Sequence, residues 1–423
     1  MQQENEDPAR PARRSGKRRV IKVPSEPTKL CQPFSSVLAD LVSVTPETVV
    51  AAVSSGNSVG AVAALRHLTE SAPVYGLPVD FLIETAIALE TDNWEHVAVQ
   101  FVRRQFIGPK GKFLLVGPYS VRRSGGKTSA LTAVYGQSIP CRKVDGLGAQ
   151  LQVMLGALNQ EIPEVIPVTI LAACGMVGNE GGEAFIVPDG WEFPGSEGGP
   201  SLNDMGEQRR RLTGSGFECI RQIFGPSSAE LLLSALENEQ QGILLQSREY
   251  QFHEAGHASG FGLRCKLGEN LLTTPWSRAI EEYRADGVEF ELATHLLPIE
   301  EAGQLITANL CIRFGIDAHR LGGLECDTDV NASLLTFDRL FANGALDIEK
   351  GRLVFVDPSH RGLVRAVEQQ RVEAIRLTLD EMHVKNKTAI GGLYGSVPLS
   401  RAGQMLFRTF IIEPCRGLFR ELR

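Results

Sequence analysis

The chain has 423 residues, 43% of them hydrophobic, with 22% charged residues and a formal net charge of −7. This length accommodates two or three domains with proper cores, and the acidic balance argues against a nucleic-acid partner, whose binding domain would be basic. No stretch has the length and hydrophobicity of a membrane span or a signal-peptide core, so we expect a cytoplasmic protein.

The first segment, residues 1–28, crowds arginines and lysines among prolines and has almost nothing to bury. Such a composition predicts a disordered basic tail. A solvated tail is favoured over one that touches acidic lipid or nucleic acid.

The pattern of residues 29–110 predicts a helical segment. Thr45-Pro46-Glu47 is typical of a capped helix start, and the apolar spacing within Ser58–Leu68 and Pro78–Leu89 is helical. The character then changes in residues 111–224, where Gly and Pro separate short apolar or β-branched runs that predict a small sheet. These runs are Lys112–Val116, Ala130–Tyr135, Val165–Ala172 and Glu183–Val187.

Two stretches of this second segment invite other interpretations. Ser124–Thr128 has the Gly-Lys-Thr of a phosphate loop, but Val121 stands where the first glycine is required, so a hairpin turn and strand explain it better. Asp189–Gly216 is rich in Gly, Pro, Ser and charge, which predicts a long loop, either a lid beside a site or a plain connector.

The central segment, residues 225–343, contains the pentad His253-Glu254-Ala255-Gly256-His257. Apolar residues at helical spacing from Ser228 to Phe252 predict that the pentad lies on a long buried helix. Because four residues make about one helical turn, His253 and His257 can present both imidazoles to one metal ion. Glu254 then lies beside them, placed to accept a proton from an activated water. The alternative is a pair of packing histidines.

A second helical pattern, Ser277–Ala293, alternates acidic and apolar residues, and the Gly- and Pro-containing stretch before it can turn the chain back. A catalytic zinc needs a third protein ligand, and Glu281, Glu282 and Asp286 are the candidates, which a small helix rotation would exchange. If Glu282 binds the metal, either of the other two can accept the Nδ1–H of a histidine. The alternative is a solvated acidic face.

The last segment, residues 344–423, begins with a hairpin pattern. Ala345–Ile348 and Arg352–Val356 are joined by Glu349-Lys350-Gly351, and helices are predicted over 362–382 and 401–410. The chain as a whole is therefore predicted to be a mainly helical α+β protein. It combines a zinc-binding helical core with a small sheet in its N-terminal half and a C-terminal β-hairpin.

The pentad, followed by Glu281-Glu282-Tyr283-Arg284-Ala285-Asp286, resembles the two zinc motifs of the dipeptidyl-peptidase III family of HExxH (gluzincin-like) metallopeptidases. The resemblance is local. The family has one more residue between its histidines, a longer separation of the motifs, Cys in place of Tyr283 and Glu in place of Asp286. Carried over by position, it implies Zn2+ bound by His253, His257 and Glu282, Glu254 as the catalytic base, and Glu281 and Asp286 supporting the ligands.

These roles imply the following mechanism. The water attacks a carbonyl carbon while Glu254 takes its proton, and Glu254 then returns that proton to the leaving amine. The oxyanion needs a further donor, and six residues are candidates: His295, His319, Tyr283, Arg284, His360 and His383. The eight cysteines are scattered without a C-x-x-C pair, which predicts reduced, mostly buried thiols and gives no support for a cysteine-ligated zinc.

The predicted function is a zinc-dependent hydrolase, a metallopeptidase acting on a peptide or small amide substrate. A metal-dependent enzyme of another type, for non-peptide amide hydrolysis or isomerisation, is the alternative, because the same ligands polarise any carbonyl. An inactive, metal-stabilised interaction protein is the third possibility. Glu254 argues against it, since a structural site has no need of an acid between its ligands.

Overall fold

A computed structural model describes residues 44–123, 126–140, 149, 151, 162, 164–175, 185–186, 199–259, 275–319, 327–383 and 400–418. They belong to the unit Val44–Arg423. The predicted basic tail lies outside the described residues, as does the 189–198 part of the predicted loop. No helix among the described residues is both long enough and apolar enough to cross a bilayer.

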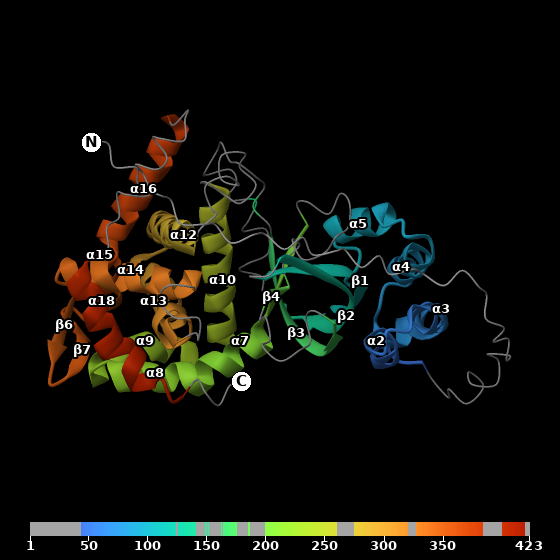
Figure 1. Cartoon of the computed structure of the whole chain (residues 1–423), viewed down its shortest axis with the longest axis horizontal. Coiled ribbons are helices and arrows are strands. Elements are labelled where there is room, and N and C mark those ends of the chain that lie inside the picture. The colour runs from blue at the N-terminus through green and yellow to red at the C-terminus, as the bar shows by residue number, and fades with distance from the viewer. Residues whose placement is uncertain are drawn as a thin grey trace, which may run out of the picture. The chain divides into compact units, whose positions relative to one another are not determined.

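The described part of the N-terminal segment is helical, and its helices pack on the sheet (Figure 1). Thr45 starts the first helix by accepting a hydrogen bond from the backbone N–H of Thr48, as its sequence predicts. Leu65, Leu114 and Val116 are fully buried in one apolar cluster between these helices and the sheet. The helices are α2 (Pro46–Ser54), α3 (Ser58–Tyr75), α4 (Val79–Thr91) and α5 (Glu95–Val102).

The described sheet has the strand order β1-β2-β3-β5-β4. Gly126 at the start of β2 pairs with Arg123 at the end of β1, so the hairpin interpretation of the phosphate-loop-like stretch is confirmed. Four strands fall on the predicted apolar runs, and β5, which runs parallel to β3, was not predicted. The strands are β1 (Lys112–Arg123), β2 (Gly126–Ser138), β3 (Val165–Cys174), β4 (Phe185–Ile186) and β5 (Ser201–Asp204).

The loop prediction for 189–216 is wrong for its described second half. Asp204 accepts hydrogen bonds from the N–H groups of Gly206 and Glu207 and so begins a helix. Glu207 then pairs with Arg210 and Arg211, which lie one turn further on, so charges that looked typical of a loop are ion pairs along a helix. The helices here are α7 (Met205–Arg211), the π-helical η2 (Leu212–Gly216) and α8 (Phe217–Ile223).

The helical core follows, and its long predicted helix is in fact two. Asn238 ends the first and caps the second by accepting a hydrogen bond from the N–H of Gln241. The helix that carries the histidine pentad is α10, and the acidic helix is α12 (Figure 1). The elements are α9 (Pro226–Glu237), α10 (Glu239–Ala258), α12 (Pro275–Leu296), α13 (Ile299–Gly315), η3 (Asp317–His319) and α14 (Thr328–Ala342).

The C-terminal segment opens with the predicted hairpin. Lys350 and Gly351 adopt positive φ values of 50° and 76° at its turn, as a tight two-residue turn requires. The predicted helix over 362–382 is interrupted at Val367. The elements are β6 (Leu346–Glu349), β7 (Arg352–Phe355), α15 (His360–Ala366), α16 (Glu368–His383), α18 (Arg401–Phe407), the π-helical η4 (Arg408–Ile412) and α19 (Glu413–Cys415).

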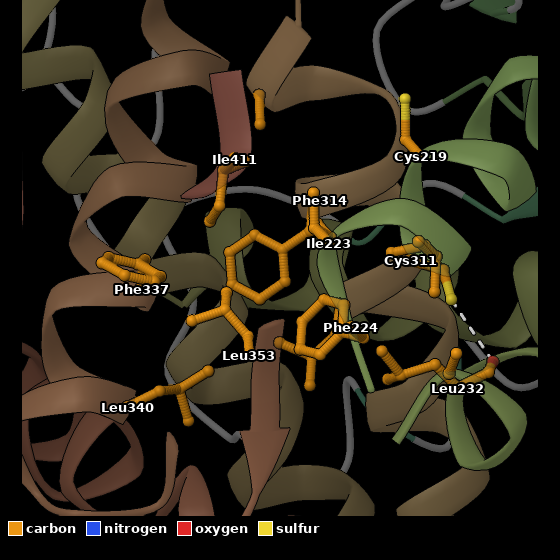
Figure 2. Close-up of a cluster of buried hydrophobic side chains, with 14 of the residues drawn as sticks. Cys219, Ile223, Phe224, Leu232, Cys311, Phe314, Phe337, Leu340, Leu353 and Ile411 are labelled. Atoms are coloured by element: carbon orange, nitrogen blue, oxygen red, sulfur yellow. Dashed lines mark hydrogen bonds between the residues drawn. The ribbon is translucent and has the colours of Figure 1, made fainter. Parts of the chain in front are cut away.

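The largest apolar cluster joins the helical core to this hairpin (Figure 2). The ring of Phe224 stacks on Phe355 with centroids 5.5 Å apart, and Phe314 lies 6.1 Å from Phe224. Cys311 is buried in the same cluster, where its thiol donates to the carbonyl of Leu232. The prediction of a mainly helical α+β protein with a small sheet and a C-terminal hairpin is confirmed.

Candidate metal centre

Helices α10 and α12 touch at a glycine of the pentad. A Cβ atom on Gly256 would lie 2.6 Å from the carbonyl oxygen of Ala285 and 2.7 Å from its Cα, distances that no side chain can occupy. The backbones can therefore approach this closely only because residue 256 is glycine. Arg284 reinforces the contact by donating from Nη2 to the carbonyl of Gly256 at 2.8 Å.

This approach brings three candidate ligand atoms together. The Nε2 atoms of His253 and His257 are 3.0 Å apart, and Glu282 Oε2 lies 3.2 Å from the first and 3.5 Å from the second. A tetrahedral zinc with bonds of about 2.0 to 2.1 Å places its nitrogen and oxygen ligands about 3.3 Å from one another. The triangle therefore has the size that a single zinc ion requires.

The outer nitrogens of both imidazoles are held by carboxylates. His253 Nδ1 lies 2.9 Å from Asp286 Oδ1, and His257 Nδ1 lies 3.3 Å from Glu281 Oε1. With an Nδ1–H donated to each carboxylate, each neutral ring turns an Nε2 lone pair toward the other. Two lone pairs 3.0 Å apart repel each other unless a cation lies near both. Geometry therefore distinguishes the three candidate third ligands. Glu282 faces the Nε2 atoms, whereas Asp286 and Glu281 face the Nδ1 atoms.

The electrostatics of the centre favour positive charge. Burial lowers the pKa of His257, but the charge of Glu282 and hydrogen bonds to Glu281 and Glu282 outweigh it and raise this pKa to about 9. At His253, burial is likewise outweighed by Asp286 and Glu282, and its pKa is raised well above the ordinary value. Burial raises the pKa of Glu282, yet the two histidines lower it well below its usual range. This field stabilises protons or a metal cation.

Two buried arginines neutralise the supporting acids. Arg313 grips Asp286 with two hydrogen bonds of 2.8 Å and reaches Asp317 at 3.1 Å. Arg284 grips Glu281 in the same bidentate way, at 2.7 and 2.8 Å. Paired in this way, the carboxylates remain charged although they are buried, and they hold the imidazoles in a fixed orientation.

Two further buried acids, Glu249 and Glu289, share the partner Asn309 with Asp286. Asn309 Nδ2 is within hydrogen-bond distance of Asp286, Glu289 and Glu249, at 3.1, 3.0 and 3.5 Å. Burial raises the pKa of Glu249 to about 7, with the charge of Asp286 adding to it, and burial and the charge of Glu249 raise the pKa of Glu289 well above its usual range. Both acids thus tend to keep their protons, which limits the negative charge that the interior must hold.

Glu254, which follows His253 directly, is half-buried, and Tyr250 lies one turn earlier on α10. Burial and the charge of Glu254 raise the Tyr250 pKa well above the ordinary value, so the phenol keeps its proton and is available as a donor near Glu254. By sequence, Tyr250 is one of the apolar residues at helical spacing between Ser228 and Phe252. Its spacing of four residues from Glu254 was the available signal.

The residues considered as oxyanion donors have other partners in the structure. The Tyr283 hydroxyl donates to Glu373 on α16 at 2.7 Å, and burial lowers the pKa of His319 to about 4. The side chain of His383 is not among those described. The remaining contacts are Arg284 with Glu281, His295 with Glu291, His319 with the carbonyl of Phe314, and His360 with Glu300.

Gly256→Ala tests the helix contact. The added methyl group collides with the backbone of Ala285, so α12 must move away from α10 and carry Glu282 with it. We expect a loss of stability of about 1 to 3 kcal/mol, typical of overpacking, together with weaker zinc binding. Chelator competition and thermal unfolding measure the two effects. Gly417→Ala is the control, because a Cβ at Gly417 meets nothing within 4 Å; equal effects in both variants would contradict the helix-contact explanation.

Glu249→Gln tests the buried acid layer by its pH dependence. The pKa of Glu249 in the folded chain, about 7, lies above its ordinary value of 4.5, so the unfolded chain releases this proton first as the pH rises. As the pH rises from about 4.5 to 7, the free energy of unfolding of the wild type should therefore fall relative to that of Glu249→Gln. Above about pH 7 the difference between the two proteins should stay constant. Denaturant unfolding with a chelator present measures it. Glu70→Gln, an exposed change on α3, should follow the wild type.

Comparisons with known proteins agree with this architecture. A family model described as "Family of unknown function (DUF6014)" matches residues 37–360. The structure of DPP III from Caldithrix abyssi is similar, with a TM-score of 0.61 and 14% identity, covering 87% of this chain and 72% of that one. Dipeptidyl-peptidase III from Corallococcus sp. strain EGB gives a TM-score of 0.52 and 15% identity, covering 87% and 70%.

At these identities the likeness shows a shared fold. No curated protein matches the chain. The family model spans well over half of the 423 residues, and the chain therefore belongs to the family of unknown function DUF6014.

Proposed function

We propose that this protein is a zinc-dependent hydrolase that cleaves peptide bonds. One observation carries the proposal: the Nε2 atoms of His253 and His257 and Oε2 of Glu282 form a triangle with edges of 3.0 to 3.5 Å. In this proposal these three residues hold Zn2+, while Asp286 and Glu281 fix the ring orientations. Two imidazoles and a carboxylate are ligands that suit zinc, and three protein ligands leave a position for substrate or water.

When bound, zinc supplies Lewis acidity that polarises a carbonyl group and lowers the pKa of water. Glu254 has the role of general base, taking a proton from the attacking water and later donating it to the amine that leaves. Tyr250 is a positioning residue in this scheme, in which its protonated hydroxyl group donates to the Glu254 carboxylate whose charge it senses.

Two considerations support a peptide as the substrate. The fold is shared with proteins whose structures are titled dipeptidyl-peptidase III. Glu254 also lies beside the proposed ligands, where a purely structural zinc would require no acid. A hydrolase acting on non-peptide amides would use the same residues, and the choice of substrate in the assay distinguishes the two.

Glu254→Gln and Glu282→Gln separate catalysis from metal binding. We expect Glu254→Gln to keep its zinc and lose activity by about 10²- to 10⁴-fold, the usual contribution of a general base. Glu282→Gln should lose zinc affinity and activity together. The measurements are zinc content after dialysis and the release of fragments from a synthetic peptide library, followed by mass spectrometry.

Glu291→Gln is the matched control, because Glu291 also lies on α12 but pairs with Arg371 and contacts His295. It should keep both zinc and activity. A wild-type protein that holds zinc but cleaves no peptide would contradict the peptidase assignment, and one that holds no metal would contradict the metal centre itself.

Tyr250→Phe tests the positioning role. Loss of one hydrogen bond to a charged group costs about 1.5 to 3 kcal/mol, so kcat/KM should fall by roughly 10- to 100-fold while zinc content stays unchanged. Tyr283→Phe removes another buried hydroxyl group, one that binds Glu373, and should leave kcat/KM unaltered. Equal losses in both variants would show that Tyr250 acts only through stability.

A further inference from the structure

Three potential metal ligands from distant parts of the chain meet away from the helix pair α10 and α12. Cys219 lies on α8, His319 in η3 and Cys415 in α19. The two sulfur atoms and one ring nitrogen of His319 all lie within 4.8 Å of one another. Both cysteines are fully buried, and His319 is 6% exposed.

We propose that Cys219, His319 and Cys415 form a second Zn2+ site, which is structural. Zinc–sulfur bonds of about 2.3 Å in a tetrahedron place two thiolates about 3.8 Å apart, which is compatible with ligand atoms that lie within 4.8 Å of one another. Two thiolates and an imidazole are a recurring ligand set for zinc. The sequence showed no such site, because 196 residues separate the two cysteines.

The hydrogen bonding of the histidine fixes its tautomer. His319 Nε2–H donates to the carbonyl of Phe314 at 2.9 Å, so the neutral ring carries its lone pair on Nδ1. Metal-binding histidines characteristically donate their second N–H to a carbonyl or carboxylate in this way, which fixes both the tautomer and the ring plane.

Gln222, which is exposed, has a side-chain oxygen near this cluster that could serve as a fourth ligand. Its Oε1 lies 3.9 Å from Cys415 Sγ, and its Nε2 donates to Glu218 at 3.3 Å. The donated hydrogen bond orients the amide so that the oxygen, rather than the nitrogen, faces the cysteine. Two sulfurs, one nitrogen and this oxygen would give the zinc ion four protein ligands.

The surroundings suit a metal complex without net charge. Cys219 and Cys415 belong to the main apolar cluster, together with Ile220, Ala318 and Ile411. Figure 2 shows Cys219 and Ile411 in this cluster. Two thiolates, one neutral imidazole and Zn2+ sum to zero charge, so their burial among apolar side chains carries no cost for an isolated ion. The metal would fasten α8 and α19 to η3.

This connection bears on the first centre through one short path. Asp317 begins η3 two residues before His319, and it accepts a hydrogen bond from Arg313. Arg313 in turn grips Asp286, which holds His253. A metal that anchors η3 would therefore steady the arginine on which the proposed hydrolytic centre depends.

Cobalt substitution tests the second site without reference to hydrolysis. The purified whole chain is stripped of metal under reducing conditions and titrated with Co2+. Thiolate ligands give Co2+ an intense near-ultraviolet charge-transfer absorption, and the proposed hydrolytic centre contains only nitrogen and oxygen ligands. We expect this absorption in the wild type, its loss in Cys219→Ser and in Cys415→Ser, and a loss of one zinc equivalent per chain in each variant.

Two controls make the result specific. Cys311→Ser changes an equally buried thiol that binds the carbonyl of Leu232, and it should keep the absorption. The double variant His253→Ala, His257→Ala should also keep it, which distinguishes failure of this site from failure of the proposed function. Absence of the absorption in the wild type would overturn the proposal even if the serine variants do not fold. A Cys219–Cys415 disulfide found by peptide mass mapping of the unreduced wild type would overturn it as well.

Discussion

The contact between Gly256 and Ala285 sets the distance between α10 and α12, and the candidate metal centre depends on that distance. Each helix by itself carries only half of the ligand set. A side chain at residue 256 would separate the backbones and move Glu282 away from His253 and His257. The H-E-x-x-H pattern allows any residue at its fourth position. At residue 256 the packing of the two helices, rather than the chemistry of the site, restricts that position to glycine.

The charged groups behind the ligands stay charged because each has a partner. Arg313 and Arg284 each bind one supporting carboxylate with two hydrogen bonds, and these carboxylates in turn hold the imidazoles. The described hydrogen bonds give Glu249 and Glu289 no such arginine partner. Burial raises the pKa values of these two acids instead. Burial of so many acids is thus possible because some are neutralised by cations and others by protons.

The short helix η3 connects the two proposed metal sites. Its first residue, Asp317, belongs to the charge network of the proposed hydrolytic centre, and its last, His319, belongs to the proposed cysteine site. Structural metals commonly stabilise segments that have little regular structure of their own. A metal at the second site would therefore support the proposed hydrolytic centre by keeping Arg313 in place.

The sequence by itself determined the features that depend on local periodicity and turn chemistry: the histidine spacing on one helix face, the Thr45 cap, the β6–β7 hairpin and the mainly helical class. It left Glu281, Glu282 and Asp286 equivalent, because the rotation of α12 follows from packing against α10. It also left Cys219 and Cys415 unrelated and showed no strand at Ser201–Asp204. Those features were decided by tertiary structure alone, since residues distant in the chain come together only when whole helices and strands pack.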